Sequence, residues 1–413
     1  RFKESALGHL RANSTLLSGM SPVADSVDPP TSGGDTAETD GAREVTRDRP
    51  FQATMTKKRL LSQAGSLKET MHYEFDLEGS GIQYRAGDCF GIHPNNSNRA
   101  IDEVLQAVGL EGSESVICEG APMSLRDALV RMCLQSVGVE FVKRLAAMPW
   151  AKGSPAAVAL EGGDLTLSTF IREHHVVDAL RSQSVSGLDA TTFLGLLRKA
   201  QPRLYSVASS PRKDPNRVAL TVETLRYQWN ERYVEGVTTC WLADHVEEGA
   251  TVPMYLVAND DFQFPAEPKP VVMVGPGTGI APFRAYLEEL EATGRNIDTW
   301  LFFGHQHEEN DFLYEEEIRR WESSGVLSRA SFAWSRDQEC KVYVQHRIAE
   351  HGAELWSWLQ RGAVVFVCGD AKGMAPSVAE AFAQIATVHG GVEDGEAWLQ
   401  GLRAEGRYKA DVY

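Results

Sequence analysis

Apolar and polar residues alternate along two stretches of the chain, and this alternation predicts β-strands. Residues 71–78 have the period of two that is typical of a half-buried strand, and residues 218–227 repeat it. Between these two regions, from about residue 98 to residue 199, apolar residues recur at helical spacing. We therefore expect an antiparallel β domain that is divided by a helical insertion.

The pattern changes after residue 265. Four short apolar runs, VVMVG, TWLFFG, ASFAWS and VVFVCG, alternate with segments that have the periodicity of amphipathic helices. Strands separated by helices indicate βαβ units and a parallel sheet. The sequence thus predicts a Rossmann-like α/β domain at the C-terminal end.

Residues 13–48 are rich in Ser, Asp, Thr, Gly and Pro and poor in aromatic residues. Such a segment cannot bury enough apolar surface to order itself, so we expect a flexible tail or linker over residues 1–50. The expected domains are a β-barrel at residues 51–97 and 200–266, a helical connecting insertion at 98–199, and an α/β domain at 267–413.

Composition and charge narrow the class of protein. The 413 residues carry a formal net charge of −16, which argues against nucleic acid as the main partner. No apolar run approaches the length of a transmembrane helix, so no membrane partner is expected. The six cysteines are scattered and form no C-x-x-C pair, which favours a reducing, cytoplasmic location and predicts no metal site.

A glycine-rich turn follows the first apolar run of the α/β region. Gly275, Gly277, Thr278 and Gly279 stand between this expected strand and a helix that opens at Ala281. Glycines let the backbone approach a pyrophosphate closely, and a helix N-terminus supplies free N–H groups. The turn is a candidate dinucleotide site, although a plain tight turn would have the same pattern.

A cationic cluster follows the third apolar run. Ser335, Arg336 and Lys341 offer a hydroxyl, a planar donor fork and a point charge, a set suited to a phosphate monoester. In a dinucleotide domain this cluster would select the 2′-phosphate of NADPH over NADH. The alternative is an ordinary solvated surface.

Two segments of the β region could hold a flavin. Arg203 could bind a pyrophosphate, the ring of Tyr205 could stack on the flavin, and the Ser206 hydroxyl could reach the edge of the flavin ring. Residues 236–239 (GVTT) precede a predicted helix, where they could grip a second phosphate or act only as a helix cap. Cys368 ends the fourth apolar run, at the sheet edge where α/β proteins bind ligands, although a strand cysteine is usually an apolar filler.

Taken in order, these motifs resemble the ferredoxin–NADP reductase-like module of the diflavin reductases. The likeness covers residues 51–413 and rests on YRAGD, RLYSVASS, TVETLRY, GVTT, GPGTGIAPFR, DFLYEEE, AWSRDQ, KVYVQ, VCGDAKGMA and the terminal RYKADVY. The terminal Tyr is most similar to the sulfite reductase branch of the family.

The resemblance implies a role for each matching residue. The FAD-binding set would be Arg203, Leu204, Tyr205, Ser206, Thr221, Val222, Glu223, Tyr227, Gly236, Val237, Thr238, Thr239 and Tyr413, with Tyr413 stacking on the flavin and moving aside for nicotinamide. The NADP-binding set would be Gly275, Gly277, Thr278, Gly279, Ser335, Arg336, Lys341, Val342, Tyr343, Val344 and Gln345.

Ser206, Cys368 and Asp411 match the trio that lines the hydride-transfer site of the family. The expected chemistry is positional, because hydride passes directly from nicotinamide to flavin and the protein aligns the two rings. None of the three is expected to act as a covalent nucleophile.

Three features depart from the family pattern. Ser377 stands where the family often has an acidic residue near the cofactor, and GVTT replaces a more glycine-rich segment. His174 and His175 stand where a Thr-containing version is usual, and we interpret them as a solvated pair rather than a metal site. Only about fifty residues precede the module, with no pattern of a flavodoxin-like FMN domain.

The resemblance therefore implies an FAD-dependent NADPH reductase that delivers electrons singly. The chain is either truncated, or it uses a separate flavodoxin-like FMN carrier. The favoured role is in assimilatory sulfite reduction, with the sulfite reductase haemoprotein subunit as partner. The alternatives are a reductase for a flavodoxin, a nitrate-reducing partner or a haem protein, and a non-catalytic interaction subunit that retains the fold.

Overall fold

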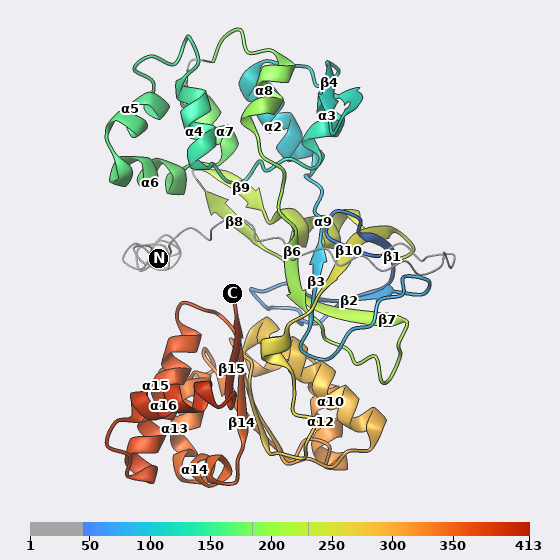
Figure 1. The fold of residues 1–413 in the computed structure, drawn as a ribbon, viewed down its shortest axis with the longest axis vertical. Coiled ribbons are helices and arrows are strands. Elements are labelled where there is room, and N and C mark those ends of the chain that lie inside the picture. The colour runs from blue at the N-terminus through green and yellow to red at the C-terminus, as the bar shows by residue number, and fades with distance from the viewer. Residues whose placement is uncertain (1–43, 184, 230) are drawn as a thin grey trace, which may run out of the picture. The chain divides into compact units, whose positions relative to one another are not determined.

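The computed structural model describes residues 44–413, apart from residues 184 and 230 (Figure 1). Most of the expected tail, residues 1–50, lies outside the described residues. Residues 44–50 include a turn in which the backbones of Thr46 and Arg49 exchange two hydrogen bonds of 3.1 Å. The carbonyl oxygen of Arg47 accepts a hydrogen bond of 2.8 Å from His93 Nε2, so this end of the expected tail packs on the folded chain.

Six antiparallel strands form the first sheet, in the order β6-β3-β10-β1-β2-β7. The strands are β1 (Phe51–Leu60), β2 (Thr70–Asp76), β3 (Cys89–Ile92), β6 (Arg203–Ser206), β7 (Arg217–Glu223) and β10 (Thr251–Val257). A β-bridge joins Val207, directly after β6, to Leu220 in β7. Because this bridge links the two edge strands, the sheet curls into the barrel-like layer that the sequence predicted.

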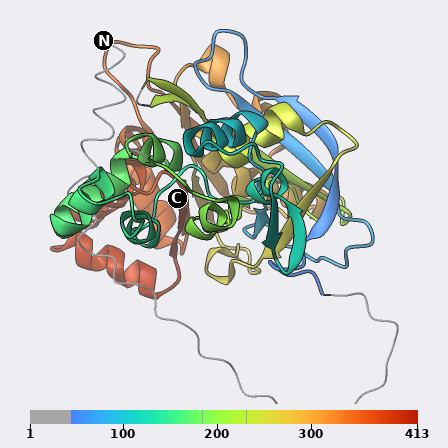
Figure 2. The same ribbon diagram turned by 90° about the horizontal axis from the view of Figure 1, so that it is seen from above.

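The helical insertion separates β3 from β6, as predicted. Its helices are α2 (Asn98–Val108), α3 (Leu125–Leu129), α4 (Val139–Ala146), α5 (Pro155–Glu161), α6 (Asp164–Glu173), α7 (Val176–Arg181) and α8 (Ala190–Leu196). Ser97, Ser124, Ser154 and Asp189 cap the first turns of α2, α3, α5 and α8 with side-chain hydrogen bonds. The insertion has a hydrophobic core of its own, and its helices lie together in both views (Figures 1 and 2).

Two hairpins were not expected from the sequence. The hairpin of β4 (Ser115–Cys118) and β5 (Ala121–Ser124) turns at Glu119 and Gly120, whose φ angles of 55° and 79° are typical of a type I′ turn. The strand expected at residues 218–227 ends at Glu223, and β8 (Arg226–Trp229) pairs instead with β9 (Arg232–Glu235). The helix α9 (Val237–His245) follows this second hairpin.

The second sheet has five parallel strands in the order β13-β12-β11-β14-β15. Four of them are the predicted apolar runs: β11 (Val271–Val274), β12 (Thr299–His305), β13 (Arg329–Trp334) and β14 (Val364–Gly369). The fifth, β15 (Tyr408–Val412), comes from the chain terminus, where a frayed end is the usual expectation.

Helices cover both faces of the parallel sheet, as in doubly wound folds. Alternate strand residues point to opposite faces, so Met273 and Leu301 pack with one set of helices while Val272 and Trp300 pack with the other. The first face carries α10 (Ala281–Thr293) and α12 (Glu315–Ser324). The second carries α13 (Val344–Glu350), α14 (Gly352–Gln360), α15 (Met374–Gly390) and α16 (Gly395–Ala404) (Figure 1).

The two sheets share one hydrophobic core. Phe264, which precedes the parallel sheet, stacks on Phe366 of β14 with ring centroids 4.5 Å apart. Buried polar contacts reinforce the boundary: Glu288 of α10 accepts a hydrogen bond of 2.7 Å from the backbone N–H of Ser210 and pairs with Lys213 at 3.0 Å. Groups at this boundary are therefore held at fixed distances.

Candidate active site

The glycine-rich turn lies against the end of β14. The predicted helix begins at Ala281 and is preceded by one 3₁₀ turn, Gly277–Ile280. A Cβ atom on Gly279 would stand 2.1 Å from the carbonyl oxygen of Cys368, and one on Gly275 would stand 2.4 Å from the carbonyl oxygen of Gly279. Both glycines are therefore required for packing, and they bring the turn beside Cys368.

The structure brings Ser206, Cys368 and Asp411 together, although they come from three strands in two sheets. Cys368 and Asp411 are directly paired in the parallel ladder of β14 and β15. Ser206 ends β6 and donates a hydrogen bond of 2.7 Å from Oγ to Oδ2 of Asp411. The Cys368 thiol is fully buried.

Both thiols at this boundary are protonated near neutral pH. Burial, followed by the negative charge of Asp411, raises the pKa of Cys368 well above its ordinary value. The same two causes raise the pKa of Cys89, a neighbour of Ser206, to about 12. A neutral thiol is a poor nucleophile, so these groups suit packing and weak hydrogen bonding.

Tyr413 is anchored at the same place. Its backbone N–H donates to the carbonyl oxygen of Gly369 at 3.1 Å, which continues the pairing of β15 with β14. Its hydroxyl lies 2.7 Å from Oγ1 of Thr278 in the glycine-rich turn. The residue is nevertheless 64% exposed, so its ring presents a face on which a planar ligand can stack.

The start of α9 has the features of an anion site. Gly236 caps the helix without a side-chain hydrogen bond, and the Tyr205 hydroxyl lies near Thr238 in the first turn. Thr238 Oγ1 is buried, and no hydrogen bond of normal geometry reaches it from the residues that the structure describes. An unsatisfied buried hydroxyl at a helix N-terminus, close to the strand β6 that carries the exposed Arg203, fits a bound diphosphate.

Several other residues of the expected FAD-binding set have side chains that are buried, paired or apolar. Thr221 and Val222 of β7 are buried, and Thr221 Oγ1 is hydrogen-bonded to the Tyr314 hydroxyl at 2.7 Å, so only their backbones could reach a ligand. Glu223 is ion-paired with Lys68. Leu204 and Tyr227 are exposed, at 55% and 42%, and offer apolar surface.

The cationic cluster after β13 has free donors. The backbone N–H groups of Ser335 and Arg336 donate to His305 and Gln306, each at 2.9 Å, and this fixes the loop beside β12. The side chains of Arg336 and Lys341 are exposed and have no ion-pair partner among the described residues. Two unpaired cations at the end of β13, on the same sheet as the glycine-rich turn, are suited to an additional phosphate.

The remaining residues of this cluster begin α13. Tyr343 is exposed and caps the helix, with its backbone N–H donating to His346 Nδ1 at 3.1 Å. Val342 and Gln345 are half-buried, whereas the Val344 side chain is buried in the core of the parallel domain. A ligand could therefore contact Val344 only through its backbone.

The structure corrects the interpretation of His174 and His175 as a solvated pair. His174 stacks on Phe170 with ring centroids 4.1 Å apart, and His175 stacks on Trp229 at 5.7 Å. Both rings are half-buried, because His174 packs within the insertion and His175 packs on the β8–β9 hairpin. Ser377, the departure in α15, is half-buried and has only backbone contacts among those described.

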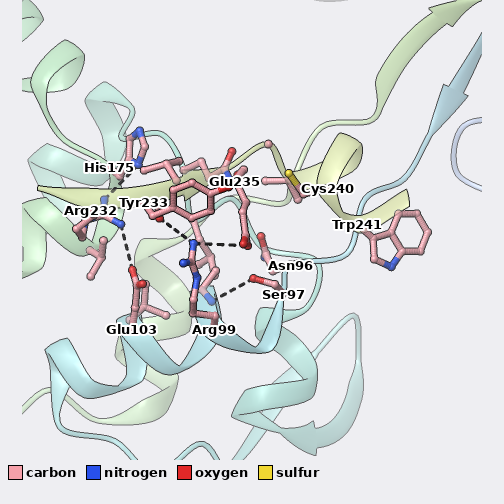
Figure 3. A pocket seen from close by; sticks show the side chains of 18 of the residues that line it. Asn96, Ser97, Arg99, Glu103, His175, Arg232, Tyr233, Glu235, Cys240 and Trp241 are labelled. Atoms are coloured by element: carbon pink, nitrogen blue, oxygen red, sulfur yellow. Dashed lines mark hydrogen bonds and ion pairs between the residues drawn. The ribbon is translucent and has the colours of Figure 1, made fainter. Parts of the chain in front are cut away.

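A cluster of charges that the sequence did not reveal lines a pocket beside α9 (Figure 3). Arg232 of β9 makes a bidentate pair with Asp178, at 2.8 and 2.9 Å, and a further pair with Glu103 at 3.0 Å. Although burial alone would raise it, these hydrogen bonds lower the pKa of Asp178. The pocket also includes Gly236, and an ion pair of 3.5 Å between Arg99 of the insertion and Glu235 lies directly before the start of α9.

Comparisons with known proteins agree with this geometry. A family model described as FAD binding domain matches residues 43–123, and one described as oxidoreductase NAD-binding domain matches residues 273–380. The chain thus combines a flavin-binding with a nicotinamide-dinucleotide-binding domain. Its fold class is that of an antiparallel FAD-binding layer, split by helices and followed by a Rossmann-like domain.

Two relatives that share one name are similar to most of this chain. The chain is 39% identical over 371 residues to the sulfite reductase [NADPH] flavoprotein alpha-component of Serratia proteamaculans, which covers 89% of this chain and 61% of that protein. It is 37% identical over 378 residues to the protein of the same name from Bacillus subtilis, with 90% and 62% covered. The chain therefore spans about three fifths of the length of the curated relatives it matches.

The described residues contain no helix with the length and apolarity needed to cross a bilayer. All six cysteines lie in the described part of the chain, and all are free thiols.

Proposed function

We propose that this chain is an FAD-dependent NADPH oxidoreductase that passes electrons from NADPH through FAD to a one-electron carrier. The observation that carries the proposal is the meeting of Ser206, Cys368 and Asp411 where the flavin-binding layer contacts the nicotinamide-binding sheet. Residues of both sheets could face two stacked rings here. FAD, when bound, would accept a hydride and release its two electrons singly.

FAD would be held by residues 51–97 and 200–266. The N–H groups at the start of α9 and the buried Thr238 hydroxyl would bind its diphosphate, together with the Arg203 side chain. Tyr413 would cover the ring system and would have to move before nicotinamide could stack there. Until it moves, the hydrogen bond between the hydroxyls of Tyr413 and Thr278 would hold Tyr413 at the glycine-rich turn.

NADPH would lie on the α/β domain, residues 267–413. Its diphosphate would follow the turn from Gly275 to Gly279, and its 2′-phosphate would pair with Arg336 and Lys341. Ser335 would add a hydroxyl donor at the end of β13. The free state of both cations, among the described residues, supports selection of NADPH over NADH.

The trio itself would act by position and charge. Asp411 would face the positive charge that develops on nicotinamide, and the hydrogen bond from Ser206 would hold the Ser206 hydroxyl in place beside the reacting rings. The buried Cys368 would pack against the nicotinamide without forming a bond, because its thiol is protonated. These roles require only that the two rings are aligned and that water is excluded.

The names of the relatives support sulfite reduction as the pathway served. We propose that the reduced chain delivers electrons, through a flavodoxin-like FMN domain or a separate FMN carrier, to a sulfite reductase haemoprotein subunit. A cytoplasmic location agrees with the six free thiols.

The test is anaerobic rapid mixing of the FAD-reconstituted chain with NADPH and, separately, with NADH. Fast bleaching of the flavin absorbance by NADPH, with much slower bleaching by NADH, is expected. Full FAD binding without bleaching by either nucleotide would contradict the proposal and favour the non-catalytic interaction subunit.

A further inference from the structure

Two cross-strand pairs meet at the boundary between the sheets. In the parallel sheet, Cys368 of β14 pairs with Asp411 of β15. In the antiparallel sheet, Cys89 of β3 pairs with Ser206 of β6. Residues directly opposite each other on neighbouring strands have side chains on the same face, so each pair acts as a unit. The hydrogen bond from Ser206 to Asp411 joins the two pairs.

Cys89 is the one member of this group of four without a role in the proposed function. Its Sγ lies 3.8 Å from Ser206 Oγ, with a geometry in which the thiol donates and the hydroxyl accepts. The Ser206 hydroxyl has a single proton, which it donates to Asp411 at 2.7 Å. The Cys89 thiol therefore occupies an acceptor position of Ser206 while the Ser206 proton points at the carboxylate.

The surroundings of Cys89 keep its thiol protonated, so that it can donate a hydrogen bond. The residue is 8% exposed, and the nearby Asp411 carboxylate disfavours a thiolate. A thiol fixed on a strand can stop the Ser206 side chain from rotating into its other staggered positions. Even a weak S–H···O contact is sufficient for this, because it has to favour only one rotamer of the small Ser206 side chain over the others.

We propose that Cys89 is a positioning residue that orients the Ser206 hydroxyl toward Asp411. This inference rests on the proposed function, because it concerns the same hydride-transfer site. Cys89 touches neither cofactor in this scheme, and it acts only through Ser206. The competing explanation is that Cys89 merely fills space in the core, as buried cysteines often do.

A double-mutant cycle separates the two explanations. The 413-residue chain, reconstituted with FAD, is compared in four forms: unaltered, Cys89→Ala, Ser206→Ala and the double variant. We expect Cys89→Ala to slow single-turnover flavin reduction by about three- to fivefold, the range of a weak hydrogen bond. FAD content should not change. In the Ser206→Ala background, Cys89→Ala should have no further effect on the rate.

Two further variants complete the design. Cys89→Ser retains a donor of similar shape and should keep at least about half of the unaltered rate. Cys133→Ala, which removes a thiol that is hydrogen-bonded to Ser136 in the insertion, should leave the rate of flavin reduction unchanged. If Cys89→Ala does not fold, Cys89→Val takes its place in the cycle, because it fills the space without a hydrogen-bond donor.

The outcomes distinguish this inference from the proposed function. No flavin reduction in the unaltered chain would overturn the proposed function itself. Reduction at an equal rate in the unaltered chain and Cys89→Ala would overturn only the role of Cys89. If Cys89→Ala slows reduction by the same factor whether or not Ser206 is present, the effects in the cycle are additive. That result would likewise overturn the role of Cys89 and identify the residue as packing.

Discussion

Ser206 Oγ donates a hydrogen bond of 2.7 Å to Asp411 Oδ2, across 205 positions of the chain. It joins the end of a strand in the antiparallel sheet to the last strand of the parallel sheet. Because the two sheets also share a hydrophobic core, the bond fixes a hydroxyl and a carboxylate at the boundary between a flavin-binding and a nicotinamide-binding domain.

Removal of the buried Thr238 hydroxyl should have two effects of opposite sign, one on the stability of the flavin-free chain and one on FAD binding. Thr238→Val should stabilise the flavin-free chain by about 1 kcal/mol, because it removes a buried polar atom that has no partner among the described residues. The same change should weaken FAD binding by roughly tenfold, since the lost hydrogen bond would be made to a charged group. Urea unfolding of the flavin-free chain and fluorescence titration with FAD measure these effects. A loss of stability in the flavin-free chain would contradict this role.

Gly279 allows the turn to pack on β14. Gly279→Ala would place a Cβ 2.1 Å from a backbone oxygen, so we expect a loss of about 2 kcal/mol in unfolding free energy and weaker NADPH binding. Gly401→Ala in α16 is the matched control, because a Cβ there has open space and should stabilise the helix slightly. Equal stability of the two variants in thermal unfolding would contradict this packing role.

Arg336 and Lys341 should set the choice of nucleotide. Arg336→Ala and Lys341→Ala should each raise the KM for NADPH by roughly tenfold or more, the worth of a charged hydrogen bond, and leave the KM for NADH unchanged. Steady-state reduction of an artificial acceptor measures both constants. Arg320→Ala, which removes an exposed cation paired with Glu291, is the control. Equal effects on NADPH and NADH would rule out a 2′-phosphate site here.

Acid should destabilise the chain through Glu74. The hydrogen bond from His72, and then the charge of Arg217, lower the pKa of Glu74 from 4.5 to about 2. The unfolded chain therefore takes up a proton at a pH where the folded chain does not, so this contribution is complete above about pH 6 and falls as the pH drops through 4.5 toward 2.

Between about pH 6 and pH 4 the loss from this group should be about 1 kcal/mol. Urea titrations of the unaltered chain and of Glu74→Gln at both values of pH measure it. The variant should lose about that much less over the same interval. Parallel changes in the two proteins would show that Glu74 does not drive the acid sensitivity.

Much of the architecture follows from local pattern. The four apolar runs became β11 to β14, and the glycine-rich turn leads into α10 at Ala281, because a buried parallel strand and a helix start have strong local signatures. The hairpin at Glu119 and Gly120 was missed, since its strands of four residues are too short to show a period.

The site depends on contacts that no local pattern contains. Strand β15 has a mixed polar sequence, and it forms only because β14 offers a free edge. The resemblance grouped Ser206, Cys368 and Asp411, but it did not indicate Cys89, whose partner lies 117 positions away. The unpaired hydroxyl of Thr238 and the ion pairs of Arg232 likewise depend on tertiary packing among the described residues.

The most direct test of the hydride-transfer site is single-turnover reduction of bound FAD in Ser206→Ala, with NADPH and with NADPH carrying deuterium at the transferred position. We predict a rate lower by roughly 10- to 100-fold, a clear isotope effect and an unchanged FAD content, because the variant loses a positioned hydroxyl and its contact with Asp411. A rate equal to that of the unaltered chain, with FAD fully bound, would contradict this assignment.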